Sequence, residues 1–405
     1  LVSTVGFDMD YTLAIYRQDA MDRLSIDATA RKLVEMGHPE CLLDAPYRAD
    51  FPIRGLLIDR KLGNILKMDR YRYVKKAYHG MKELTREERH QSYHSRPVHV
   101  GSSRYHWVDT LYGLSEVAVY AGAIEQLNAI GADVDRGQLF DDIRHCIDLS
   151  HQDGSILDEI RAHKDRYLTR DPDLADTLHK LKSAGKHLFL LTNSHAAYTD
   201  EIMAYLVEGK LNGYSSWRSY FDFIITDSKK PSFFTEEAVP FRLAGGDGGA
   251  PINAFERGRL YSGGCLTELM RLAGAEGDSV LYVGDHIYGD VLRAKKDTAW
   301  RTAMIIQEMD QEMRVHEEVT PLFERMDHLE AVTDLLQEEL RRRNVDLKRL
   351  NKELEHARER GLSTTAIGTA RVNQRKLVDR IKVRQRDMDV ELEEIEVRID
   401  DAFHP

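Results

Sequence analysis

The sequence is poor in cysteine, has no long hydrophobic run and carries no excess of positive charge. Its three cysteines, Cys41, Cys146 and Cys265, lie far apart without metal-binding spacing, which favours a reducing compartment. No apolar run approaches the roughly 20 residues that a membrane-spanning helix needs. With 57 Lys and Arg against 68 Asp and Glu, the net charge of −11 argues against a nucleic-acid polymer as partner, but is compatible with a local site for a small anion. We expect a cytoplasmic protein that binds neither membrane nor nucleic acid.

Short apolar runs that end in polar residues recur along the chain. They are residues 2–7, 187–191, 221–225, 279–283 and 303–306. Stretches with helical periodicity lie between them, at 174–184, 198–207, 266–273 and 291–296. Apolar strands that alternate with helices predict an α/β fold with a doubly wound parallel sheet, covered by helices on both faces. Such sheets bind ligands at the carboxyl ends of their strands, where the polar residues of this chain gather.

The domain organisation follows from where this pattern stops and resumes. Residues 1–16 hold the first strand, and residues 171–322 hold the rest of the core. Residues 17–170 interrupt the core with a β piece, at 53–58 and 64–68, followed by a mainly helical segment. An insertion at this point can cover the strand ends as a cap that excludes water and selects the substrate.

The composition changes in residues 323–405, where apolar residues at spacings of three and four recur among charged ones. A break at 361–368 separates two such stretches, which predicts an antiparallel helical hairpin. A coiled coil between copies of the chain and a hairpin packed on its own domain both fit, and Arg343 and Arg384 at seam positions count against the coiled coil. We expect a homo-oligomer. The seam residues are Leu329, Val332, Leu336, Leu340, Leu347, Leu350, Leu354, Leu377, Ile381, Met388, Ile395 and Ile399.

Two carboxylates, Asp8 and Asp10, stand one residue apart where the first strand ends. Residues i and i+2 of a strand point the same way, so both side chains face one small volume. Their mutual repulsion requires a cation, a shared proton or both. In phosphoryl transfer Asp8 can attack phosphorus, and Asp10 can protonate the leaving oxygen and then deprotonate water. The alternative is a structural pair that caps a helix or forms a turn.

Polar residues after the next two strands can hold a phosphate group. Thr192, Asn193 and Ser194 offer two hydroxyls and an amide to its oxygens, and the alternative is that they cap the following helix. Lys230 can neutralise the phosphoryl charge. A solvated loop lysine is the alternative for this position, and Lys229 competes for the role.

A second acidic pair, Asp285 and Asp290, follows a later strand. Oxygen ligands at this edge of the sheet suit Mg²⁺, which takes one or two carboxylates and keeps several waters. We expect Asp8, Asp285 and the backbone carbonyl of Asp10 to be its ligands. Asp290 is expected to stand behind them and to orient Lys230.

Six segments carry a resemblance to a known family, namely 6–14, 51–56, 63–69, 228–234, 261–264 and 281–290. Their strand-end motifs resemble those of the haloacid-dehalogenase phosphatases. In their full length they are similar to the cytosolic purine 5′-nucleotidase family, which prefers IMP and GMP. The resemblance, which covers roughly residues 2–320, implies Mg²⁺-dependent hydrolysis of nucleoside 5′-monophosphates through an aspartyl-phosphate, with phosphate transfer to nucleosides as a related activity.

That family binds the nucleoside with residues of its cap. Its Arg-x-x-x-Asp-x-x-His pattern falls on Arg144, Asp148 and His151, so the resemblance implies that these contact the base, contact the ribose and stack on the purine. Tyr112 stands where the family has a stacking Phe. Asp109 replaces an Asn that faces the base, and an ionised Asp cannot donate, so the preferred base is left open. Without the resemblance, the pattern favours the solvated edge of a helix.

Three functions remain open at this stage. The leading hypothesis is a Mg²⁺-dependent nucleoside 5′-monophosphate hydrolase with a purine preference. A second is a phosphatase of another small phosphate ester, because caps diversify on one core. The third is a nucleotide-binding scaffold whose hairpin recruits a partner, which the full set of catalytic residue types disfavours.

Overall fold

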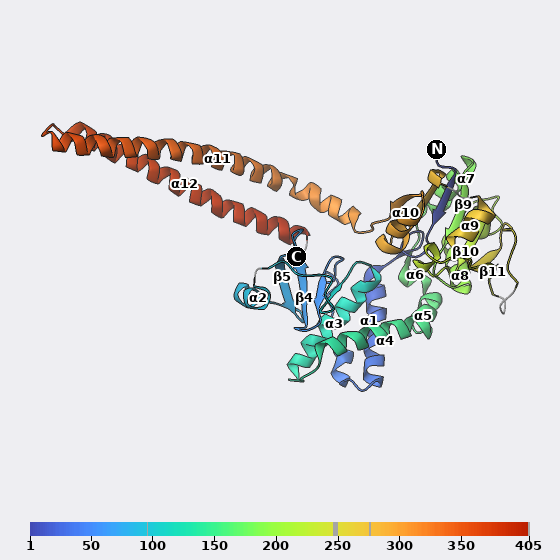
Figure 1. The fold of residues 1–405 in the computed structure, drawn as a ribbon. Coiled ribbons are helices and arrows are strands. Elements are labelled where there is room, and N and C mark those ends of the chain that lie inside the picture. The colour runs from blue at the N-terminus through green and yellow to red at the C-terminus, as the bar shows by residue number, and fades with distance from the viewer. Residues whose placement is uncertain (95, 246–249, 275–276, 404–405) are drawn as a thin grey trace. The chain divides into compact units, whose positions relative to one another are not determined.

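The computed structural model describes residues 1–405 apart from 95, 246–249, 275–276 and 404–405, and apart from the side chain of Tyr112. The chain forms two compact units, Leu1–Ile306 and Gln307–Pro405 (Figure 1). Among the described residues, none of the helices combines the length and the apolarity needed to span a membrane.

The first unit is built on a seven-stranded sheet. In spatial order its strands are β11 (Phe241–Leu243), β12 (Leu260–Gly263), β10 (Phe223–Thr226), β9 (His187–Leu191), β1 (Thr4–Phe7), β13 (Val280–Gly284) and β14 (Arg301–Met304). All neighbours are parallel except β11, which pairs antiparallel with β12. The central strand β1 is buried over its whole length, which explains its unbroken apolar sequence. The predicted α/β fold with a doubly wound parallel sheet is confirmed.

Helices cover both faces of this sheet. Along β9, Leu188 and Leu190 belong to one hydrophobic core and the alternating Phe189 and Leu191 to another. The helices that connect the strands are α7 (Leu174–Ser183), α8 (Ala196–Val207), α9 (Leu266–Ala273) and α10 (Arg293–Asp297). The helix predicted at 291–296 is only partly right, because a π-helical turn over Ile287–Leu292 precedes α10.

The inserted segment leaves and returns to the core at one place. Strands β2 (Ile15–Tyr16) and β8 (Leu168–Thr169) pair antiparallel there, next to the predicted limits of the insertion at 17 and 170. Its helices are α1 (Gln18–Glu35), α2 (Arg86–Tyr93), α3 (Tyr112–Ala129), α4 (Arg136–Gln152), α5 (Leu157–Ala162) and α6 (Lys164–Tyr167), with a 3-10 turn at Glu40–Asp44. Helices α1, α3 and α4 pack together around Leu33, Val117 and Ile143, which are fully buried.

The β piece of the insertion is a five-stranded antiparallel sheet. In spatial order its strands are β6 (Lys82–Glu83), β5 (Val74–His79), β4 (Asn64–Met68), β3 (Leu57–Asp59) and β7 (Tyr105–Trp107). The strand predicted at 53–58 is wrong in its first half, because the chain turns at Gly55, whose φ is +94°, and the strand begins at Leu57.

The second unit is a hairpin of α11 (Met309–Glu359) and α12 (Thr365–Phe403). The two helices run antiparallel: Arg325 pairs with Glu391 near one end, and Gln374 Nε2 donates to the Arg343 carbonyl near the other, at 2.8 and 3.3 Å. The hairpin starts before residue 323, where the apolar spacing placed it. The earlier part of α11 escaped notice because it is highly charged and contains Pro321, a residue that usually ends helices.

The seam of the hairpin differs from the predicted one at two positions. Leu377 is 37% exposed and its neighbour Val378 is buried instead, while Arg384 lies on the exposed side of α12. A shift of one residue turns a helical side chain by about 100°, so a stripe of mixed apolar and charged residues does not define the contact face closely. The seam is mainly apolar: it buries Val319, Leu329, Leu354, Met388, Ile395 and Ile399, together with the polar Gln374.

Candidate active site

Four adjacent parallel strands carry the predicted catalytic residues to one edge of the sheet. Asp8 follows β1, Thr192 follows β9, Lys230 stands in the loop after β10, and Asp285 follows β13. Backbone hydrogen bonds continue the ladder past the strand ends, from Asp8 N to Val283 O and from Thr192 N to Ile225 O, both 2.9 Å. Side chains more than 270 residues apart in the chain are therefore neighbours in space.

A buried lysine joins two of the carboxylates. Lys230 Nζ lies 3.0 Å from Asp8 Oδ1 and 2.7 Å from Asp290 Oδ1, and it donates to the Tyr282 hydroxyl at 2.9 Å. Burial raises the pKa of Asp8 well above its ordinary value, although Lys230 opposes the shift. Burial acts to lower the pKa of Lys230, but Asp290 and Asp8 raise it more, so the ammonium group stays charged.

The structure distinguishes between the two candidate lysines. Lys230 is 9% exposed and makes the contacts just described, whereas the side chain of Lys229 is exposed to solvent. Lys229 has a φ of +57°, a left-handed conformation that reverses the local backbone direction. The two adjacent ammonium groups therefore point into different environments.

Both carboxylate oxygens of Asp10 accept hydrogen bonds. The Tyr16 hydroxyl donates to Oδ1 at 2.6 Å and the Ser194 hydroxyl donates to Oδ2. The Tyr16 hydroxyl already donates its hydrogen to Asp10, so it accepts in the 2.8 Å contact with the Tyr198 hydroxyl, which is the donor. Burial raises the pKa of Asp10, and the bonds from Ser194 and Tyr16 oppose that shift. The result is a fixed carboxyl group with a tendency to hold a proton.

The residues predicted to bind phosphate already form hydrogen bonds within the protein, which use part of their donor and acceptor groups. Asn193 Oδ1 accepts from Lys230 N at 2.6 Å and from the Ser228 hydroxyl at 2.9 Å, and its amide donates to the Lys230 carbonyl at 3.0 Å. One amide hydrogen of Asn193 is left for a ligand. Thr192 Oγ1 is buried and accepts from Ser194 N at 3.1 Å. Asn193 thus holds the loop that presents Lys230.

Three carboxylates approach one another closely enough to hold a cation. One oxygen each of Asp8, Asp285 and Asp290 lie within 4.8 Å of one another. Burial, and then the charge of Asp290, raise the pKa of Asp285 to about 7, which shows how unfavourable the uncompensated charge is. Hard oxygen donors at this spacing fit Mg²⁺. Both oxygens of Asp290 already accept hydrogen bonds, Oδ1 from Lys230 and Oδ2 from His286 N, whereas Lys230 contacts Asp8 through Oδ1. Asp8 Oδ2 and Asp285 are therefore the carboxylate groups most available to a metal ion.

Close packing explains one glycine of this motif. A Cβ on Gly284 would lie 2.5 Å from the Cβ of Asp290. Asp290 Oδ2 also accepts from His286 N at 3.2 Å, which fixes the carboxylate against the strand end. The absence of a side chain at Gly284 therefore allows Asp290 to reach Lys230.

A pocket of about 470 Å³ opens beside Asp10. Its walls include three tyrosines and two histidines, from both the core and the insertion. Its lining residues are Asp10, Tyr11, Tyr16, Met21, His151, Gln152, Leu157, Ile160, Asn193, Ser194, His195 and Tyr198. Tyr16 and Tyr198 were not predicted from the sequence. Tyr11 and Tyr16 stand close to the first motif, but nothing in the spacing of Tyr198 connects it to Asp10.

The residues predicted to bind the nucleoside are only partly at this pocket. His151 lines it, and burial lowers the pKa of its imidazole, so the ring is neutral near pH 7. Arg144 and Asp148 are exposed on α4 and outside the described lining, with Arg144 Nε 3.4 Å from Glu116 Oε1. Only the last turn of α4 reaches the pocket, which explains the separation. Asp109 is exposed outside the lining, and the side chain of Tyr112 lies outside the described residues.

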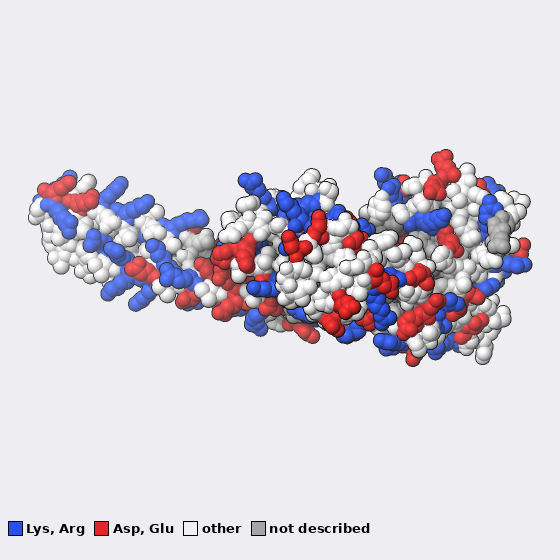
Figure 2. All heavy atoms as spheres, turned by 90° about the horizontal axis from the view of Figure 1, so that it is seen from below, with Lys and Arg blue, Asp and Glu red and all other residues white. Residues whose placement is uncertain are grey.

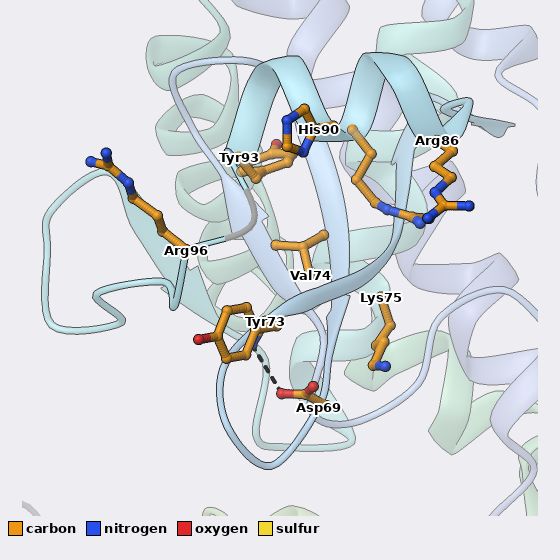
Figure 3. A pocket seen from close by; sticks show the side chains of 9 residues that line it. Asp69, Tyr73, Val74, Lys75, Arg86, His90, Tyr93 and Arg96 are labelled. Atoms are coloured by element: carbon orange, nitrogen blue, oxygen red, sulfur yellow. Dashed lines mark hydrogen bonds between the residues drawn. The ribbon is translucent and has the colours of Figure 1, made fainter. Parts of the chain in front are cut away.

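A second pocket, of about 600 Å³, lies on the inserted β-sheet beside α2. Figure 3 shows His90 and Tyr93 reaching over Val74 of β5, with Arg86 and Arg96 on opposite sides. This pocket is larger and basic, but none of the four strand-end motifs contributes to it. The smaller pocket beside Asp10 is therefore the candidate active site.

Known proteins resemble this chain along most of its length. A 5′-nucleotidase domain-containing protein of Dictyostelium discoideum is 34% identical over 324 residues, which are 78% of this chain and 54% of that protein. The human 5′-nucleotidase domain-containing protein 2 is 31% identical over 331 residues, which are 78% of this chain and 62% of that protein. The chain thus spans less than two thirds of the length of these relatives.

Among solved structures, a predicted HAD-like family hydrolase from Porphyromonas gingivalis aligns over 77% of this chain and 97% of its own, with 13% identity and a TM-score of 0.31. The model of the 5′ nucleotidase family matches residues 1–405. The family predicted from the strand-end motifs is confirmed by this match, and the chain belongs to the 5′-nucleotidase family.

Proposed function

We propose that this chain hydrolyses nucleoside 5′-monophosphates to nucleoside and phosphate, with Mg²⁺ as cofactor. The observation that carries the proposal is the 3.0 Å contact between buried Lys230 and Asp8, next to a pocket that Asp10 lines. A nucleophile, a fixed cation and an acid at one pocket are the groups that phosphoryl transfer requires. Membership of the 5′-nucleotidase family supports the same reaction.

In the first step, an oxygen of Asp8 attacks phosphorus and the bond from phosphorus to the 5′-oxygen breaks. Asp10 gives its proton to that leaving oxygen, a role that its raised pKa favours. The phosphoryl group is then held as an ester of Asp8, with Lys230 beside it to balance its charge. Tyr16 and Ser194 keep the Asp10 carboxyl group in position through their hydrogen bonds.

In the second step, Asp10 is ionised and takes a proton from water. The water oxygen attacks phosphorus, the bond to Asp8 breaks, and inorganic phosphate leaves. When bound, Mg²⁺ would be held by Asp8, Asp285 and the Asp10 carbonyl, and would help to neutralise the phosphoryl oxygens. If a nucleoside hydroxyl replaces water, the same step transfers the phosphate to the nucleoside.

We infer a preference for purine over pyrimidine monophosphates, with IMP and GMP favoured. The neutral ring of His151 and the tyrosines around it offer stacking partners for a large base. The roles inferred for Asp109, Tyr112, Arg144 and Asp148 stay predictions, because the described lining of the pocket does not include them. The cytoplasmic location inferred from the cysteines also stays a prediction.

A panel of phosphate-release assays tests the proposal. The substrates are IMP, GMP, AMP, UMP and a sugar phosphate, each with Mg²⁺ and with a chelator, and the controls are Asp8→Asn and Lys229→Met. We expect Mg²⁺-dependent release from IMP and GMP by the parent chain and by Lys229→Met, and none by Asp8→Asn. Equal kcat/KM for UMP or AMP would refute the purine-oxo preference.

Two outcomes of the panel would identify the alternative functions. Fastest release from the sugar phosphate would indicate a phosphatase of another ester. Nucleotide binding without release in any condition would indicate a scaffold. Turnover by Asp8→Asn, in protein free of the parent chain, would exclude the aspartyl-phosphate.

A further inference from the structure

The C-terminal hairpin has an uneven distribution of charge along its length. The outer part, residues 341–386, carries 15 Lys and Arg against 5 Asp and Glu, a net charge of +10. The inner parts, 309–340 and 387–403, carry 3 Arg against 18 Asp and Glu, a net charge of −15. On the face shown in Figure 2, blue side chains predominate over the outer part of the hairpin. One helical pair thus has a basic end and an acidic end.

Helix α12 also exposes an apolar stripe in addition to its buried seam. Val372, Val383, Val390 and Val397 are 47, 57, 50 and 58% exposed. Their spacings of 11, 7 and 7 residues bring them back to one side of the helix, within about 40° of a common direction. The stripe crosses from the basic part, with its first two valines, into the acidic part, with its last two. Four exposed valines in line are a face suited to a helix partner.

We propose that a second copy of this chain covers the valine stripe, with the two hairpins antiparallel. In that arrangement the basic outer part of each hairpin lies along the acidic inner part of the other, and the stripe of one α12 meets the stripe of its partner. A parallel arrangement would place +10 against +10 and −15 against −15. Like charges in register destabilise a coiled coil, so the charge pattern selects the antiparallel one.

The same observations disfavour a nucleic acid as the occupant. A polyanion would use the basic outer part, but it would be repelled by the acidic inner part and would leave the valines exposed. A second hairpin contacts the basic outer part, the acidic inner part and the valine stripe at once. The pairing also requires a two-fold axis, which generates a closed dimer in which both copies make the same contacts.

The first experiment measures mass in solution. Light scattering of the full chain is compared with Val383→Gln/Val390→Gln and with Val345→Gln, a still more exposed valine on α11. Glutamine keeps the helix propensity while removing the apolar contact. We expect the double variant to lose half of its particle mass, with unchanged helical circular dichroism and unchanged phosphate release per site. Val345→Gln should keep the parent mass, and high salt should shift the parent toward monomer.

The second experiment tests orientation by disulfide trapping in a Cys41→Ser background, because Cys41 is the partly exposed native cysteine and Cys146 and Cys265 are buried. Val372→Cys and Val397→Cys chains are made separately, one with a size tag. We expect a covalent dimer when the two are mixed and oxidised, and little when either is oxidised alone.

Three outcomes would overturn the proposal. Self-linked Val372→Cys and self-linked Val397→Cys would show a parallel pair. A parent chain that is monomeric at all concentrations would show that no second copy binds. An unchanged mass for the double valine variant, together with binding of the parent to a DNA duplex at physiological salt, would show that the basic part is a polyanion site.

Discussion

Replacing Lys230 with Met removes the cation that lies 3.0 Å from Asp8 and 2.7 Å from Asp290. Methionine keeps the length and the apolar stem of lysine, so the change removes charge without leaving a large cavity. The carboxylates of Asp8, Asp285 and Asp290, which lie within 4.8 Å of one another, would then face each other without the ammonium group. Breaking a buried pair in this way costs about 3–5 kcal/mol. The loss of a charge beside phosphorus should lower kcat/KM by about 100- to 1000-fold.

The loss of stability in Lys230→Met should depend on pH. Burial already raises the pKa of Asp8 and, to about 7, that of Asp285, and removing the opposing charge of Lys230 raises both further. A carboxyl group whose folded pKa lies above its unfolded value favours the folded state at low pH, and this contribution is lost as pH rises through the folded pKa. The variant should therefore approach the parent stability near pH 4, and its deficit should grow as pH rises to 7 and beyond.

Urea unfolding at pH 5 and pH 8, with and without Mg²⁺, measures this deficit, and Lys229→Met is the matched control because its side chain is exposed. We expect a deficit of about 3–5 kcal/mol at pH 8 without metal, a smaller one at pH 5, and partial recovery with Mg²⁺. Equal losses in both lysine variants, or a deficit that does not shrink at low pH, would contradict the charge assignment.

Three further changes test separate parts of the structure. Tyr16→Phe removes a hydrogen bond that lowers the pKa of Asp10, so kcat should fall about tenfold and the limb of its pH profile that reports Asp10 should move upward; an unchanged profile would contradict this. Gly284→Ala places a Cβ 2.5 Å from Asp290 and should lower the free energy of unfolding by about 1–3 kcal/mol in a urea titration; full stability would show that the strand end can yield. Ending the chain after Ile306 should leave phosphate release per site intact and should reduce the number of copies per particle, measured by light scattering. Lost activity in a folded truncated chain would show that the hairpin supports the active site.

The strand ends were predictable because their signals are local. An apolar run, then a polar group, then a helical pattern identifies a buried parallel strand wherever it occurs, and parallel strands bring their carboxyl ends to one edge. The grouping of Asp8, Thr192, Lys230 and Asp285 followed from that alone. The helix α1 was not predicted, because its buried face includes the polar residues Asp22, Ser25 and Thr29 and so lacks an apolar period.

A local sequence pattern could not predict which of two adjacent lysines is buried, or which distant side chain contacts the site. Lys229 and Lys230 are the same residue type, but Lys229 has a left-handed backbone and an exposed side chain, whereas the side chain of Lys230 is buried. Tyr198 reaches Tyr16 across 182 residues, a contact that depends on how α8 packs against the first strand loop.

By itself, the sequence determined the α/β architecture and the order of the motifs, and it predicted Asp8 as the nucleophile, Asp10 as the acid and Lys230, with Lys229 as its competitor, as the cation. These depend on periodicity and on residue chemistry over a few positions. The tertiary structure decided which lysine is buried, that Asn193 holds the Lys230 loop, that Tyr16 and Ser194 hold Asp10, and that Arg144 and Asp148 stand apart from the pocket. Those outcomes depend on distances between segments, and distances between segments are set by packing of the whole core, not by spacing along the chain.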